Sequence, residues 1–198
     1  MLMSEKVGKN VFLYGKVEIG RNSVIQDNVI IGSSDDGTIE IGENAIIRSG
    51  TVIYSGVKIG KNLRTGHNIL IRENTEIGDD VLVGTNSVVD GNCKIGSRVS
   101  IQTNVYITTY TVIEDDVFMG PCAVTTNDKY MMYGGAELKG PIIKKGAKIG
   151  ANSTILPGIV VGEGAIIGAG SVVTKDVKNK EVVAGVPIKV LRRKKQHD

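Results

Sequence analysis

The chain repeats every six residues, and this repeat limits the fold more than any other feature. Hexads run without slippage from Ile41 to Val124, beginning IGENAI, IRSGTV and IYSGVK. The register resumes from Ile143 to Lys178, and a shorter run begins at Val7. The first position is a large aliphatic residue, the second is often Gly, and the fourth is Asn, Gly or Asp. Self-similarity of this length indicates a solenoid.

A period of six predicts an all-β chain. An α-helix of 3.6 residues per turn cannot keep a six-residue repeat on one face, whereas a short strand followed by a sharp corner can. The aliphatic residue then points inward at each step, and Asn, Asp or Gly takes the positive φ that the corner needs. Three strands close a triangular coil, so residues 18 apart stack. At about 4.8 Å per coil, about eight coils make a parallel β-helix roughly 40 Å tall.

The composition agrees with β structure in one domain. The 198 residues include 26 Gly, two Phe and no Trp, and Ile and Val dominate the apolar set. We expect a β-helix domain at 1–178 and a C-terminal extension at 179–198. The formal net charge is only +3, which predicts no nucleic-acid partner. The basic residues gather in the tail, at Lys189, Arg192, Arg193, Lys194 and Lys195.

Targeting signals and cysteine pairs are not evident in the sequence. No apolar run approaches the roughly 18 residues that span a bilayer, and the start MLMSEKVGKN lacks an apolar signal stretch. We therefore expect a soluble, cytoplasmic protein that makes no membrane contact. Cys93 and Cys122 lie too far apart in the sequence for a Cys-x-x-Cys pair, and no further Cys is present for a structural zinc site.

Two segments break the register. The first, around 33–38, adds about four residues and reads as a polar surface loop. The second, 125–142, contains Tyr130, two methionines, another tyrosine and a Gly-Gly pair. Long excursions from a regular scaffold are often functional, although this one equally suits a cover that packs on the prism or on a neighbouring subunit.

Stacking at 18 residues places polar side chains in columns at one corner. One column contains Ser49, His67, Thr85, Thr103 and Pro121, and the next contains Asn68, Asn86, Asn104 and Cys122. His67 is the one histidine outside the tail, where His197 lies, so it is the candidate for a general base near neutral pH. The alternatives stay open: Asn at this hexad position is a common turn residue, and His67 suits an exposed corner.

Several motifs narrow the resemblance. They are Gln102-x-Asn104-Val105, Glu114 to Phe118 (EDDVF), Gly120-Pro121 and Thr126-Asn127. With these motifs the chain resembles the hexapeptide-repeat acyltransferases, closest to the nucleotide-linked amino-sugar N-acetyltransferases. The resemblance implies a left-handed parallel β-helix and a homotrimer with active sites between subunits. It also implies acetyl-CoA as the acyl donor, bound along the later coils, with no metal.

The resemblance also implies roles for individual residues. Asn104 becomes the residue that orients the attacking amine, and His67 is the catalytic candidate beside it. The substrate-binding candidates are Asn86, Asn127, Asp128 and Tyr130. The coenzyme-binding candidates are Pro121, Ala151, Gly168, Ala169 and Lys189. The ending EVVAGVPIK departs from the family element in placing Ile188 where the family has Ala.

The expected reaction is direct attack by an amino group of the sugar on the thioester. A sugar amine is partly neutral near pH 7, so orientation by Asn104 with His67 or water as the proton acceptor suffices. A hydroxyl acceptor needs a strong base, so an O-acetyltransferase that uses His67 stays open. A non-catalytic β-helical assembly protein is the alternative from another class. A carbonic anhydrase of this fold is excluded, because three zinc-binding histidines are needed and two are present.

Overall fold

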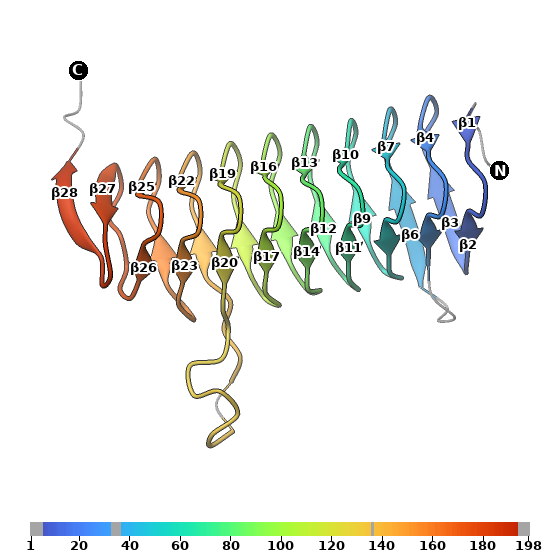
Figure 1. Ribbon diagram of the computed structural model, residues 1–198. Coiled ribbons are helices and arrows are strands. Elements are labelled where there is room, and N and C mark those ends of the chain that lie inside the picture. Colours follow the sequence, from blue (N-terminus) through green and yellow to red (C-terminus); the bar gives the residue numbers. More distant parts are fainter. Residues whose placement is uncertain (1–5, 33–36, 136, 194–198) are drawn as a thin grey trace.

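The computed structural model describes residues 6–32, 37–135 and 137–193, and their strands wrap into a triangular prism (Figure 1). Three sheets, A, B and C, form its sides. The strands of sheet A are β1 Lys6–Val7, β4 Val24–Ile25, β7 Ile46–Ile47, β10 Arg64–Thr65, β13 Leu82–Val83, β16 Ser100–Ile101, β19 Phe118–Met119, β22 Lys148–Ile149, β25 Ile166–Ile167, β27 Glu181–Ala184 and β28 Lys189–Arg193.

Sheets B and C repeat the same short strands. Sheet B contains β2 Phe12–Leu13, β5 Ile30–Ile31, β8 Val52–Ile53, β11 Leu70–Ile71, β14 Val88–Val89, β17 Tyr106–Ile107, β20 Val124–Thr125, β23 Thr154–Ile155 and β26 Val172–Val173. Sheet C contains β3 Lys16–Ile19, β6 Thr38–Ile41, β9 Lys58–Ile59, β12 Glu76–Ile77, β15 Lys94–Ile95, β18 Val112–Ile113, β21 Ile142–Ile143 and β24 Val160–Val161. The expected all-β parallel solenoid is therefore confirmed.

The register of the coils follows the hexads. Arg64 pairs with Leu82 and Leu82 with Ser100, each 18 residues on. The first break lengthens one coil to 22 residues, from Val24 to Ile46, and the second lengthens one to 30 residues. Residues 33–36 of the first break lie outside the described residues, as do 194–198 with Lys194, Lys195 and His197.

The prism runs past the eight coils expected. Sheet A pairs in parallel from β1 to β27, which takes the height to about 43 Å at 4.8 Å per step. The added coils come from the hexads before Ile41 and from β27, which lies in the expected C-terminal extension. The final strand β28 then pairs with β27 in antiparallel fashion. Ile188, between them, is buried, and its amide donates to the carbonyl of Val172.

The inward residue of almost every two-residue strand is buried, and the core is mainly Ile and Val. The three corners carry the positive φ values. The A–B, B–C and C–A corners are named here by the sheets that they join. At the C–A corner the side chains of Asn22, Asn44, Asn62 and Asp80 form a hydrogen-bonded ladder. No helix in the described ranges is long and apolar enough to cross a membrane.

Candidate active site

A ledge of small side chains lines the A–B corner of the later coils. Pro121, Ala151 and Ala169 stack in one column, and the amides of Asn152 and Gly170 donate to the carbonyls of Pro121 and Ala151. Glycines fill the neighbouring column at 120, 150 and 168, where added side chains would meet the backbone or side chain of the next coil. No side chain on this ledge extends far from the backbone. A flexible ligand can therefore lie close to the main chain here.

Lys189 lies beside the top of the ledge. Its strand partner in β27 is Ala184, and a Cβ added at Gly168 would lie 2.7 Å from the Cβ of Ala184. Lys189 is exposed and lies near the end of the column that contains Ala169. All five predicted coenzyme residues therefore belong to one continuous region of the structure.

His67 and Asn104 share this corner with the ledge. His67 is exposed, and its amide donates to the hydroxyl of Thr85 at 3.2 Å. It lies three coils, about 14 Å, below Pro121 and two coils, about 10 Å, below the level of Asn104. The hexad before it does weaken the core: Thr65 points inward and is fully buried.

Asn104 belongs to a column of turn residues. Its φ is 57°, and Asn68, Asn86 and Cys122 in the same column have φ of 55°, 56° and 60°. Asn68 donates to the side chain of Asn86 at 3.2 Å, which confirms the stacking deduced from the spacing of 18. Geometry alone gives Asn104 the same turn-forming role as its neighbours. Its distinction is its place, one coil below Pro121.

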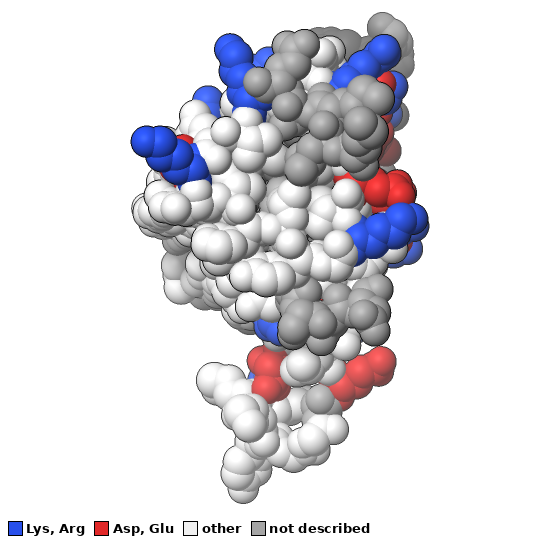
Figure 2. Space-filling view, turned by 90° about the vertical axis from the view of Figure 1, so that its right-hand side faces the viewer, with Lys and Arg blue, Asp and Glu red and all other residues white. Residues whose placement is uncertain are grey.

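The long loop leaves from a different corner. It departs at the B–C corner after β20 and projects away from the prism (Figures 1 and 2). The amide of Lys139 donates to the carbonyl of Asn127 at 2.8 Å and closes its base. Next to this base a hollow of about 630 Å³ lies between Tyr110, Val112 and the returning limb that includes Leu138. Within one chain, the loop is therefore separated from His67 and Asn104 by sheet B.

Asp128 organises the loop from within. Its carboxylate accepts the amides of Tyr130 at 2.8 Å and Met132 at 2.6 Å, and these bonds hold the pKa of Asp128 below its usual value. Tyr130 is half exposed, and Met131, Met132 and Tyr133 beyond it are almost fully exposed. The loop thus carries an apolar tip into solvent. Of the predicted substrate residues, Asn127, Asp128 and Tyr130 lie together here, and Asn86 lies at the A–B corner.

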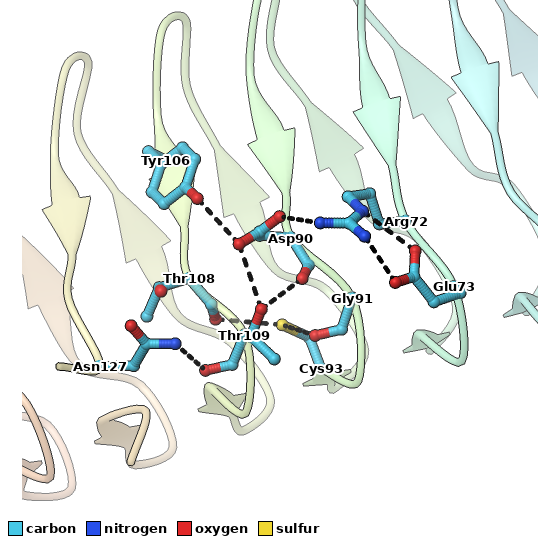
Figure 3. Close-up of polar contacts among 9 residues, drawn as sticks. All are labelled: Arg72, Glu73, Asp90, Gly91, Cys93, Tyr106, Thr108, Thr109 and Asn127. Carbon is cyan, nitrogen blue, oxygen red and sulfur yellow. Dashed lines mark hydrogen bonds and ion pairs between the residues drawn. The ribbon is translucent and has the colours of Figure 1, made fainter. Parts of the chain in front are cut away.

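A polar network at the B–C corner was not predicted from the sequence (Figure 3). Asp90 is its centre. Its carboxylate accepts hydrogen bonds from Arg72 Nη1 at 3.0 Å and from the Tyr106 hydroxyl at 2.8 Å. The hydroxyl of Thr109 lies 3.1 Å from the same carboxylate, and Asn127 Nδ2 donates to the Thr109 carbonyl at 3.4 Å. The network therefore joins three coils to the base of the loop.

Two protonation states in this network are fixed by their surroundings. Desolvation, helped by the bond to Asp90, raises the pKa of Tyr106 to about 12, so its hydroxyl stays neutral. Burial raises the pKa of Cys93 to about 11, and its thiol donates to the carbonyls of Gly91 and Thr108. Cys93 therefore packs as a protonated, inward-facing side chain.

The same arithmetic of 18 could have revealed this network. Arg72 and Asp90 are 18 residues apart, as are Asn68 and Asn86, but the sequence shows no repeated residue type at their hexad position. As to metals, no three His, Cys, Asp or Glu side chains among the residues with described positions gather closely enough to hold an ion.

Comparison with known proteins identifies the repeat. Residues 74–109 and 140–175 match the bacterial transferase hexapeptide (six repeats), and the two segments flank the loop. With this match, the left-handed parallel β-helix that the resemblance implies is confirmed. The matched residues form about a third of the chain.

The chain is similar to known acetyltransferases and acyltransferases. It is 43% identical over 49 residues to a dTDP-3-amino-3,6-dideoxy-α-D-galactopyranose 3-N-acetyltransferase of Aneurinibacillus thermoaerophilus, covering 25% of this chain and 26% of that relative. The chain therefore matches about a quarter of the length of this curated relative.

Solved structures share the fold. A putative acetyltransferase of Bacillus cereus matches with a TM-score of 0.59 and 28% identity, covering 71% of this chain and 79% of the other. The UDP-N-acetylglucosamine acyltransferase of Francisella novicida matches with a TM-score of 0.65 over 93% of this chain and 69% of the other. At 18% identity, the second match shows the fold alone.

Proposed function

We propose that this chain, which is built from the hexapeptide repeats of bacterial transferases, is an acetyl-CoA-dependent N-acetyltransferase. Its acceptor would be an amino group of a nucleotide-linked amino sugar, the kind of substrate named for the curated relative. The observation that carries the proposal is the ledge of Pro121, Ala151 and Ala169 at the A–B corner, which suits an extended thioester donor. The matching repeat and the relative's activity support it.

The ledge fits the coenzyme in shape and charge. The pantetheine arm is long, thin and rich in amides, so it needs close access to main-chain groups rather than a deep pocket. The glycines beside Ala151 and Ala169 leave that access open. Lys189 at the upper end of the ledge is placed to meet a coenzyme phosphate. The coenzyme would then run parallel to the prism axis.

The chemistry requires an unprotonated amine near the thioester. Asn104, one coil below Pro121, would orient this amine through its side-chain amide. Asn86 lies in the same column one coil lower, where it can meet the sugar. No strong base is needed, because the amine carries its own lone pair. His67 is the base on which hydroxyl acetylation would depend.

The separation of the two corners supports a homotrimer. The ledge lies at the A–B corner, whereas Asn127, Asp128 and Tyr130 lie in the loop at the B–C corner, so a second copy is needed to bring them together. Sheet B, between these corners, has an outward stripe that is mostly apolar. This stripe, which the sequence reading did not find, contains Phe12, Ile30, Val52, Leu70, Val88, Tyr106, Val124, Thr154 and Val172. Continuous apolar surface of this kind marks an interface.

The outward side of sheet C differs in character. Its residues from Glu40 through Lys58 and Glu76 to Lys94 alternate in charge, and Lys58 pairs with Glu40 at 3.3 Å. A charged side of this kind suits the solvent-facing outside of an assembly. Sheet B is therefore the side that we assign to contact between copies.

The decisive experiment measures thiol release from acetyl-CoA by the full chain. The acceptors are a panel of nucleotide-linked amino sugars, beginning with dTDP-3-amino-3,6-dideoxy-α-D-galactopyranose, and their hydroxyl counterparts. Turnover with amines alone supports the proposal. Turnover with hydroxyl acceptors that is lost in His67→Ala would establish an O-acetyltransferase. A chain that neither binds coenzyme A nor releases thiol would be the assembly protein.

A further inference from the structure

The B–C corner contains a carboxylate that the turn itself does not require. Asp90 occupies the hexad position at which the coils below and above carry Arg72 and Thr108, and the corner closes in all three cases. A turn former at this position therefore does not explain the charge. The question is what the carboxylate of Asp90 binds.

The charges around Asp90 do not balance. Arg72 makes two contacts with Glu73, at 2.7 and 3.0 Å, and one with Asp90, at 3.0 Å. Among the ion pairs of the described residues, Arg72 is the one cationic partner of Asp90. One guanidinium thus serves two carboxylates, and the bidentate geometry favours Glu73. The network keeps about one negative charge, which is the complement of one cationic group.

The carboxylate also keeps room for another donor. An ionised carboxylate has about four acceptor positions. Arg72, Tyr106 and Thr109 occupy at most three of them, because the Thr109 hydroxyl is shared with the Asp90 carbonyl. The side chain of Asp90 is 21% exposed, so a ligand can reach the free position. Its orientation is fixed by partners on both neighbouring coils (Figure 3).

The loop places this carboxylate beside a space for a ligand. Asn127 at the loop base bonds to Thr109, and the hollow of about 630 Å³ begins at the next residue, Tyr110. The Tyr106 hydroxyl points at Asp90, and its raised pKa keeps it a neutral hydrogen-bond donor rather than a second anion. Asp90 is thus the one carboxylate bound to the side chains at this corner that has a free acceptor position.

We propose that Asp90 binds the attacking amino group of the acceptor, accepts its proton, and so makes the site selective for amines. This inference rests on the acetyltransferase activity proposed above. Asp90 of one copy would act opposite the coenzyme ledge of the neighbouring copy. It therefore supplies the proton acceptor that the chemistry at the A–B corner does not provide.

The chemistry of the two nucleophiles explains the selectivity. A neutral amine attacks the thioester carbonyl, so the C–N bond forms, the nitrogen becomes positive and the carbonyl oxygen becomes negative. The nearby carboxylate stabilises this positive charge and takes a proton from the nitrogen. The C–S bond then breaks, and coenzyme A leaves as a thiolate that is protonated by solvent. A hydroxyl must lose its proton as it attacks, and a carboxylate with a reference pKa of about 3.9 is too weak a base for that step.

The test compares Asp90→Asn with a matched control, Asp115→Asn. Asp115 is also a corner carboxylate with an arginine partner, Arg98 at 3.0 Å, but it lies at the C–A corner. With the best amine acceptor of the panel, we expect Asp90→Asn to lower kcat about 100-fold. The KM for acetyl-CoA and the affinity for coenzyme A should stay the same. Asp115→Asn should keep its activity within threefold, and Asp90→Glu should recover part of the loss.

The possible failures are distinguishable. If the wild-type chain releases no thiol with any amine, the proposed function itself is wrong. If the wild-type chain turns over amines and Asp90→Asn does so within threefold, only the role of Asp90 is wrong. Should Asp90→Asn fail to bind coenzyme A or to fold, wild-type selectivity decides: hydroxyl acceptors turned over as fast as amines would overturn the proposal, and turnover of amines alone supports it.

Discussion

The backbone amide of Arg48 donates to the side-chain hydroxyl of Thr65, at 2.8 Å, where the neighbouring coil uses a carbonyl. At the equivalent place one coil on, the amide of Gly66 donates to the carbonyl of Val83. The Thr65 carbonyl instead accepts the guanidinium of Arg48. Threonine therefore replaces the inward aliphatic residue because its hydroxyl completes this coil.

The first prediction concerns this bond. Thr65→Val keeps the volume of the side chain but leaves the Arg48 amide without its acceptor, which should lower stability by about 1–2 kcal/mol. Ile53→Val, at an inward position with ordinary ladder bonds, is the control for a small core change and should cost about 1 kcal/mol or less. Thermal unfolding followed by circular dichroism compares the two. A Thr65→Val protein as stable as the wild type would contradict the assignment.

The second prediction uses a buried hydroxyl with the opposite character. Thr75 is fully buried, and its hydroxyl has no hydrogen-bond partner, whereas the hydroxyl of Thr111, two coils on, donates to the Thr108 carbonyl at 2.7 Å. Thr75→Val should therefore be neutral or stabilising by up to about 1 kcal/mol, and Thr111→Val should destabilise by about 1 kcal/mol. Urea denaturation of both variants checks the sign. Equal losses would show that Thr75 has a partner after all.

The hexads predicted the scaffold well because each inward Ile or Val has the same neighbours in every coil. The stacking of Asn68 on Asn86 followed from the period alone. The corner at which the loop leaves did not, because the few residues between Cys122 and Asn127 span a whole side of the triangle. The Asp90 network was missed because Arg72 and Tyr106 contact it only once the coils stack, and neither repeats in sequence. The catalytic roles of Asn104 and His67 stay predictions.

The third prediction separates the turn role of Asn104 from its proposed role in orienting the substrate. Asn104 has a φ of 57°, which glycine adopts freely and alanine does not. Asn104→Gly should keep the stability within about 0.5 kcal/mol of the wild type but lower kcat/KM about tenfold, because one oriented hydrogen bond is lost. Asn68→Gly, in the same column, is the control. Wild-type kinetics in Asn104→Gly would make Asn104 a turn residue alone.

The fourth prediction tests the interface assigned to sheet B. Val88 lies in the middle of the outward stripe of sheet B, and Lys94 lies on sheet C. Val88→Glu places a charge where apolar surface should be buried, so the trimer should dissociate to monomers. Lys94→Glu changes two charge units on the solvent-facing side and should leave the trimer intact. Light scattering coupled to gel filtration measures the mass. A wild-type monomer, or a trimeric Val88→Glu variant, would rule out this interface.

The fifth prediction uses the two free cysteines to locate the coenzyme. Cys122 is exposed beside Pro121 on the ledge, whereas Cys93 is buried and its pKa is raised to about 11. Near pH 8 an aromatic disulfide reagent should therefore label one thiol, and Cys122→Ser should abolish the labelling. Acetyl-CoA, which has no free thiol, should slow the labelling of Cys122 at least tenfold if it lies along the ledge. An unprotected Cys122 at saturating acetyl-CoA would place the coenzyme elsewhere, since a donor that contacts Pro121 and Ala151 cannot leave the side chain between their coils open to the reagent.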